Sequence, residues 1–120
     1  MAVTYNTTID QGADWFINFT YENPAGTPVD ITGYEAALQI RTSPLARTAV
    51  LTLDTDDGGI QITGNTGLIE CHATAQQTAA ITNGKYAYDL EITSPSAGNV
   101  VTRLVQGTVI VTPQVTRTGE

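Results

Sequence analysis

The sequence contains few of the residues that build catalytic and metal sites: its 120 residues include one cysteine and one histidine, adjacent at Cys71 and His72. A single cysteine excludes a disulfide within the chain and fits synthesis in a reducing compartment. Neighbouring residues of a strand point to opposite faces, so Cys71 and His72 cannot act together as nucleophile and base. The shortage of ligands argues equally against a tetrahedral zinc site.

Basic residues are also scarce. Five lysines and arginines face twelve acidic residues, giving a formal net charge of −7, and the five are scattered along the chain. An acidic surface repels phosphate backbones and anionic lipids, so we expect neither nucleic acid nor a membrane as partner. The N-terminus has no basic start followed by an apolar run, and no stretch approaches the roughly 20 apolar residues that span a bilayer. We therefore expect a protein that is made soluble in a cytosol, without a signal peptide.

One acidic cluster, Asp54, Asp56 and Asp57, invites comparison with a calcium loop. Its spacing fails, because an EF-hand needs an oxygen ligand where Gly58 stands and a glutamate where Asn65 stands. A solvated acidic turn is the better interpretation. Phosphate-binding, dinucleotide-binding and nucleophile-elbow motifs are missing as well. We predict a protein that is not an enzyme, with no catalytic, cofactor-binding or metal-binding residues and no cofactor.

What the sequence does contain is threonine, valine and isoleucine between glycine, proline and asparagine, an all-β composition. The organising stretch is Ile81–Ile92, a central strand after an Asn83-Gly84 turn. Four of its residues alternate onto one buried face: Tyr86, Tyr88, Leu90 and Ile92. The spacing predicts either that Tyr86 forms a tyrosine corner, with its phenol folded back onto nearby backbone, or that both tyrosines simply fill the core.

The remaining strands follow from the same alternation. They are expected at Val3–Ile9, Trp15–Tyr21, Tyr34–Arg41, Val50–Leu53, Ile60–Thr63, Leu68–His72, Val100–Gln106 and Thr108–Val115, with a short extended piece at Val29–Thr32. A single helical turn is expected within Thr74–Ala80. The predicted fold is an all-β, two-sheet antiparallel sandwich, immunoglobulin-like, with about seven to nine strands and at most one short helical turn. Residues 1–120 form one domain.

Register in the C-terminal hairpin can also be predicted. Keeping Arg103 off the core face places Leu90 opposite Leu104 and Glu91 opposite Arg103. Gly107, inside a strand pattern, indicates a bulge or a break.

The order of several short motifs resembles a family of small β-sandwich domains in the particles of tailed bacteriophages. The chain is similar to the N-terminal domains of baseplate upper proteins and to neck, tail and fibre-associated proteins. The segments that carry the resemblance are Ile9–Asp14, Gly26–Tyr34, Leu38–Arg41, Gly84–Glu91, Arg103–Gly107 and Val115–Arg117. The resemblance implies a structural building block with no catalytic residues. Its relatives continue into a stalk or receptor-binding domain where this chain ends at Glu120, which speaks against host recognition by this chain alone.

We therefore expect a non-catalytic structural component of a bacteriophage particle, located in the virion as a neck, tail or fibre-attachment subunit. Its partners would be other virion proteins, contacted in repeated copies through edge strands or through the polar termini, Met1–Asn6 and Pro113–Glu120. Capsid decoration, as a cement protein, is one alternative. A carbohydrate-binding module is another; it requires two or three exposed aromatic residues on one surface, whereas alternation turns most of the eight inward.

Overall fold

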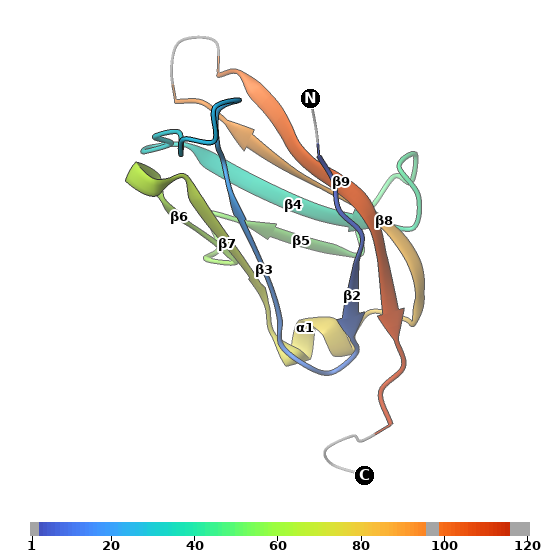
Figure 1. Ribbon diagram of the computed structural model, residues 1–120. Helices are drawn as coiled ribbons and strands as arrows, with labels where there is room; N and C mark the ends of the chain where they lie inside the picture. Colours follow the sequence, from blue (N-terminus) through green and yellow to red (C-terminus); the bar gives the residue numbers. More distant parts are fainter. Residues whose placement is uncertain (1–2, 96–98, 116–120) are drawn as a thin grey trace.

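The structure is a computed structural model that describes residues 3–95 and 99–115 (Figure 1). The strands are β1 (Val3–Thr4), β2 (Thr7–Asp10), β3 (Trp15–Thr20), β4 (Glu35–Arg41), β5 (Leu51–Asp54), β6 (Ile60–Thr63), β7 (Leu68–Ala73), β8 (Gly84–Thr93) and β9 (Val101–Thr112). A 3-10 turn, η1 (Gly64–Thr66), joins β6 to β7, and a short helix, α1 (Ala75–Ala79), follows β7. Within the described residues no helix is long and apolar enough to cross a membrane.

Two sheets pack face to face, which confirms the predicted all-β sandwich. The larger sheet has the order β1-β9-β8-β4-β5, with β2 also paired to β9, and the smaller has the order β3-β7-β6. The prediction of a wholly antiparallel sandwich is wrong at one edge, where β1 and β2 run parallel to β9. Parallel pairing needs a long connection between the two strands, and here the rest of the domain supplies it, because β1 and β9 lie at opposite ends of the chain.

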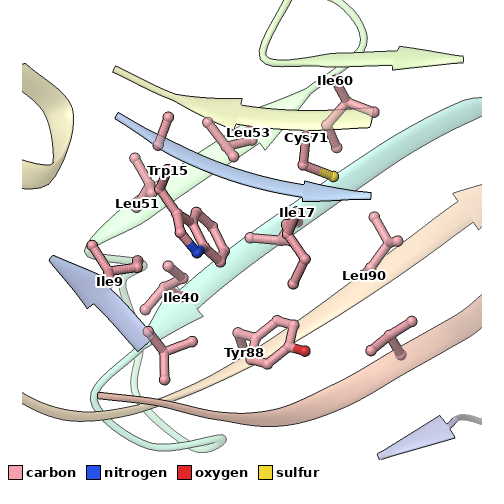
Figure 2. Packing of buried hydrophobic residues seen from close by; sticks show 14 of the residues in the cluster. Ile9, Trp15, Ile17, Ile40, Leu51, Leu53, Ile60, Cys71, Tyr88 and Leu90 are labelled. Carbon is pink, nitrogen blue, oxygen red and sulfur yellow. The ribbon is translucent and has the colours of Figure 1, made fainter. Parts of the chain in front are cut away.

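The core lies between the sheets and is filled by the alternating residues of each strand. Trp15 and Ile17 from β3 face Ile40, Tyr88 and Leu90 from the larger sheet (Figure 2). The four residues predicted to share the inner face of β8 are all buried. The extended piece Val29–Thr32 forms no strand, although Ile31 is fully buried and its amide donates to the Gly64 carbonyl.

The predicted tyrosine corner is present. The Tyr86 hydroxyl donates a hydrogen bond to the main-chain oxygen of Thr82, 2.5 Å away and four residues upstream. Gly84 between them has a φ of 152°, a conformation that side chains rarely adopt. The corner therefore fixes the direction in which the chain enters β8.

The predicted helical turn is confirmed as α1. Thr74 caps it: the Thr74 hydroxyl accepts from the Gln77 amide, and the Gln77 side chain accepts from the Thr74 amide. Buried Thr78 donates to the Ala13 carbonyl and accepts from the Gly12 amide, which ties the helix to the β2–β3 turn. The helix thereby closes one end of the sandwich (Figure 1).

Register between β8 and β9 differs from the prediction in one respect. Glu91 lies opposite Arg103, as expected, but Leu90 lies opposite Val105 rather than Leu104. A β-bulge at Leu104 adds one residue to β9, so that Arg103 stays on the wet face while Val105 turns into the core.

Gly107 is neither a bulge nor a break, because β9 runs through it without interruption. The expected strands Val100–Gln106 and Thr108–Val115 are therefore one strand. Glycine is needed here for close approach: a Cβ at position 107 would lie 2.1 Å from the main-chain oxygen of Tyr5. The N-terminal segment lies against β9 at this point, where it passes from β1 to β2.

Main-chain and side-chain hydrogen bonds hold the described part of the expected arm Met1–Asn6 against β9. The Tyr5 amide donates to the Gln106 carbonyl at 2.9 Å, and the Asn6 side chain accepts from the Thr108 amide at 3.0 Å. The expected strand Val3–Ile9 is thus divided into β1 and β2, and residues 5–6 between them are bonded to β9 without belonging to a strand. The other expected arm, Pro113–Glu120, lies outside the described residues from position 116 onward.

Candidate functional site

The acidic turn that resembled a calcium loop is occupied by its own hydrogen bonds. Asp57 accepts from the Gly59 amide at 2.8 Å, and Asp54 accepts from the Asp57 amide at 2.8 Å. These contacts are those of a side-chain-stabilised turn. Within the part of the chain that the structure describes, no three His, Cys, Asp or Glu residues gather to hold a metal ion.

Cys71 and His72 lie on opposite faces of β7, as predicted. Cys71 is buried, and burial raises the pKa of its thiol to about 12, far from the range of a reactive thiolate. His72 is on the outer face, where Nε2 lies 2.8 Å from Asp14 Oδ2 and the imidazole stacks on the ring of Phe16. The hydrogen bond to His72 is the main reason that the pKa of Asp14 is lowered. The pair fastens the start of β3 to β7.

The most distinctive surface feature is an open strand edge. β3 pairs with β7 on one side, and no other strand of the described chain pairs with it (Figure 1). The Tyr21 amide donates to the Gly67 carbonyl, and hydrogen-bonded pairs alternate along an antiparallel ladder. It follows that Phe16, Asn18 and Thr20 direct their main-chain N–H and C=O groups toward the open side.

A groove of about 660 Å³ runs along this edge, between β3 and the β1–β9 rim of the larger sheet. Its apolar lining comes from both sheets: Val3 and Tyr5, Ile17 and Phe19, Leu104 and Val105. The rings of Tyr5 and Phe19 meet edge to face across it, with centroids 6.0 Å apart. Val3 and Tyr5 are exposed at 65% and 49%, so the groove presents apolar surface to solvent.

The charge that the groove carries is negative. β3 itself has no charged residue, and Glu22 is the one charged side chain among the groove-lining residues. Asp14, just before β3, does not line the groove, and its carboxylate is bonded to His72 and to the Ala75 amide. A segment with lysine or arginine beside its apolar residues would complement this distribution.

Sequence reasoning anticipated edge strands as contact points but did not locate this one. Alternation predicted a strand at Trp15–Tyr21, and its residues Trp15, Ile17, Phe19 and Tyr21 do pack toward the core. It did not show that four of the aromatic residues, Tyr5, Phe16, Phe19 and Tyr21, would line one groove, because that depends on how β1 and β3 meet. The available signal was an aromatic, uncharged strand, Trp15–Thr20, without proline, lysine or bulge.

Comparisons with known proteins add little. No protein-family model matches the chain, and no curated protein sequence matches it. Among solved structures, the chain is similar to the CooA pilin subunit from enterotoxigenic Escherichia coli, with 17% sequence identity and a TM-score of 0.34, over 94% of this chain and 92% of that one. At such a TM-score the likeness carries no argument. The resemblance to phage virion domains has no family or sequence match behind it and rests on the quoted motifs.

Proposed function

We propose that this protein is a non-catalytic structural subunit of a bacteriophage particle, held in place by an extended segment of another virion protein that adds to β3. The observation that carries the proposal is the open edge of β3 beside an apolar groove. An added strand would bond to the main-chain groups of Phe16, Asn18 and Thr20. Its alternate side chains would enter the groove between Ile17, Phe19 and Val105.

The edge lacks the features that keep edge strands from pairing. Natural proteins blunt exposed edges with charge, proline, bulges or a covering segment, and Trp15–Thr20 has no charge, proline or bulge. Strand addition also suits a domain of this size. A stable interface needs about 800 Å² from each partner, and an inserted strand reaches that area more easily than flat docking does.

The phage setting is the finer part of the proposal. It is supported by the motif resemblance, which is carried by segments such as Gly84–Glu91 and Arg103–Gly107. We place the subunit in the neck or tail, in repeated copies, with capsid decoration as the alternative position. The acidic groove favours a partner segment with basic residues beside its apolar ones.

The proposal is tested by Asn18→Pro with Asn18→Ala as its matched control. Proline removes the amide that points to the open side and leaves the bonds between β3 and β7 in place, since proline is tolerated on edge strands. Alanine removes the side chain but keeps that amide. Each variant is supplied to phage lacking the wild-type gene, and its copy number in purified particles is measured by quantitative mass spectrometry.

We expect Asn18→Pro to fold, by circular dichroism and urea melts, yet to be depleted at least tenfold from particles, while Asn18→Ala is retained. If a folded Asn18→Pro protein enters particles at the copy number of the wild type, strand addition at β3 is ruled out. Absence of the wild-type protein from purified particles would overturn the assembly role itself. Binding to a glycan array that is lost on Phe16→Ala but kept in Asn18→Pro would show instead that the aromatic groove holds sugar.

A further inference from the structure

A second hollow, of about 710 Å³, lies on the outer face of the larger sheet. Its floor includes small residues on two adjacent strands, Ala37 of β4 and Ala87 of β8, beside Gly107 of β9, which also lines the hollow. Alanine and glycine are poor strand residues, and here they leave a depression in the middle of a sheet. The volume falls within the roughly 300–1,000 Å³ of small-molecule sites.

Two arginines stand in this hollow with their guanidinium groups already oriented. Arg41 donates to the Ala46 carbonyl at 3.0 Å and to Gln39 Oε1 at 2.6 Å. Arg103 Nε lies 3.3 Å from Asp89 Oδ2, and its Nη1 donates to Gln106 Oε1 at 3.2 Å. A guanidinium has five N–H donors, so each arginine keeps donors for a ligand.

Acceptors stand beside these donors. Asp89 and Glu91 project from β8 between Arg41 on β4 and Arg103 on β9, and all four line the hollow. The charges of the two carboxylates and the two guanidinium groups cancel. A phosphate or sulfate group would meet the carboxylates, and a cation would meet the guanidinium groups, so the hollow suits a neutral ligand that both donates and accepts hydrogen bonds.

We propose that this hollow binds a neutral oligosaccharide. Hydroxyl groups act as donor and acceptor at once, which matches the mixed lining of arginine, carboxylate and amide groups. A peptide could not add to the sheet as a strand beneath the hollow, because β8 is paired on both sides by β4 and β9. This site differs from the aromatic platform of a carbohydrate-binding module: it would hold the sugar through hydrogen bonds, since the side chain of Tyr88, the aromatic residue in the lining, is buried in the core.

The hollow is separate from the groove beside β3. The N-terminal segment divides them, with Val3 and Tyr5 lining the groove and Thr4 and Asn6 lining the hollow. A strand held at β3 would therefore leave the outer face of the larger sheet accessible. The sugar site does not depend on the assembly role, and either can fail without the other.

The test is a glycan array of neutral and acidic oligosaccharides, followed by titration of the ¹⁵N-labelled full chain with the neutral sugars that bind. Ala87→Phe fills the floor of the hollow without entering the core. Lys85→Phe is the matched control, because it places the same ring on the same face of β8 but outside the hollow. Inorganic phosphate is titrated in parallel.

We expect chemical-shift changes in β4, β8 and β9 and in the side-chain amides of Gln39 and Gln106, saturating with a neutral sugar. Ala87→Phe should weaken binding at least tenfold at unchanged melting temperature, and Lys85→Phe should bind like the wild type. An array without a neutral hit, or binding that survives Ala87→Phe, would overturn the site. Phosphate shifting the same signals at equal concentration would overturn the ligand class.

Discussion

The hydroxyl of Tyr88 donates a hydrogen bond to the main-chain oxygen of Tyr5, 2.6 Å away and 83 residues earlier in the chain. Tyr88 belongs to the central strand of the larger sheet, and Tyr5 lies where the chain crosses from β1 to β2. The bond therefore joins the core to the segment that separates the groove from the hollow. By holding this segment in place, the bond helps to shape both the groove and the hollow.

Tyr88→Phe should lower the free energy of unfolding by about 1–2 kcal/mol, because the Tyr5 carbonyl loses its donor. The benzene ring keeps the packing, so the urea m-value should not change. Hydrogen exchange should accelerate at Thr4 and Tyr5 more than at Leu38 in β4. Equal acceleration at all of these amides would show that the bond does not hold the N-terminal segment in place.

Tyr86→Phe tests the tyrosine corner. The hydroxyl bonds to the Thr82 carbonyl from a buried ring, and its loss strands a partly buried acceptor, so we expect a cost of about 1–2 kcal/mol in urea melts. A change within experimental error would mean that the phenol is merely packed. Tyr34→Phe is a suitable control, since Tyr34 is another partly buried tyrosine packed against the same core.

Alkaline pH should destabilise the fold in two steps. Burial raises the pKa of Cys71 from 9.0 to about 12 and that of Tyr88 from 10.0 to about 12. In the unfolded chain these groups lose their protons first, so the free energy of unfolding is unaffected by them below pH 9 and falls as the pH rises toward 12. Cys71→Ala should flatten the fall between pH 9 and 10, whereas Tyr88→Phe should flatten only the fall above pH 10.

The bulge at Leu104 can be checked by crosslinking. Glu91 and Arg103 are directly opposed, so Glu91→Cys with Arg103→Cys should form a disulfide under mild oxidation. Leu90→Cys with Arg103→Cys should not, because Leu90 points into the core opposite Val105. Cys71 is buried and will not compete. Efficient crosslinking of the second pair and failure of the first would disprove the observed register.

Sequence patterns predicted what depends on neighbouring residues. Period-two alternation located the strands and the inner face of β8, and the Asn83-Gly84 turn with Tyr86 located the corner. The capping box of Thr74 and Gln77 explains why α1 forms within the expected range Thr74–Ala80. Each of these features is encoded within about ten residues of chain.

The features that sequence missed depend on residues far apart in the chain. Parallel pairing of β1 and β2 with β9 joins the two ends of the domain, and alternation within one strand says nothing about the direction of its neighbour. The bulge at Leu104 was missed because the register was fixed by Arg103 alone, without requiring Val105 to be buried. Both proposed surfaces were missed for the same reason, since the groove forms between β1 and β3 and the hollow is lined by residues of β4, β8 and β9.

A substitution at Gly107 tests whether the N-terminal segment is held against β9. The three atoms nearest to a Cβ at position 107 all belong to Tyr5 and Asn6. Gly107→Ala must therefore push this segment off β9, and we expect a cost of about 1–3 kcal/mol, as for overpacking. Deleting Met1–Asn6 should also lower the melting temperature, because the bonds to Gln106, Thr108 and Tyr88 are lost.

The costs of Gly107→Ala and of the deletion in free energy of unfolding should not be additive. Deleting Met1–Asn6 removes the three atoms nearest to a Cβ at position 107, so Gly107→Ala should cost much less in the deleted chain. A double-mutant cycle in urea should then give an interaction energy of about 0.5–3 kcal/mol, within the range for residues in contact. Full additivity would show that the clash lies elsewhere. A deletion without effect on stability would mean that residues 1–6 are a free arm after all, available to a neighbouring subunit rather than bound to β9.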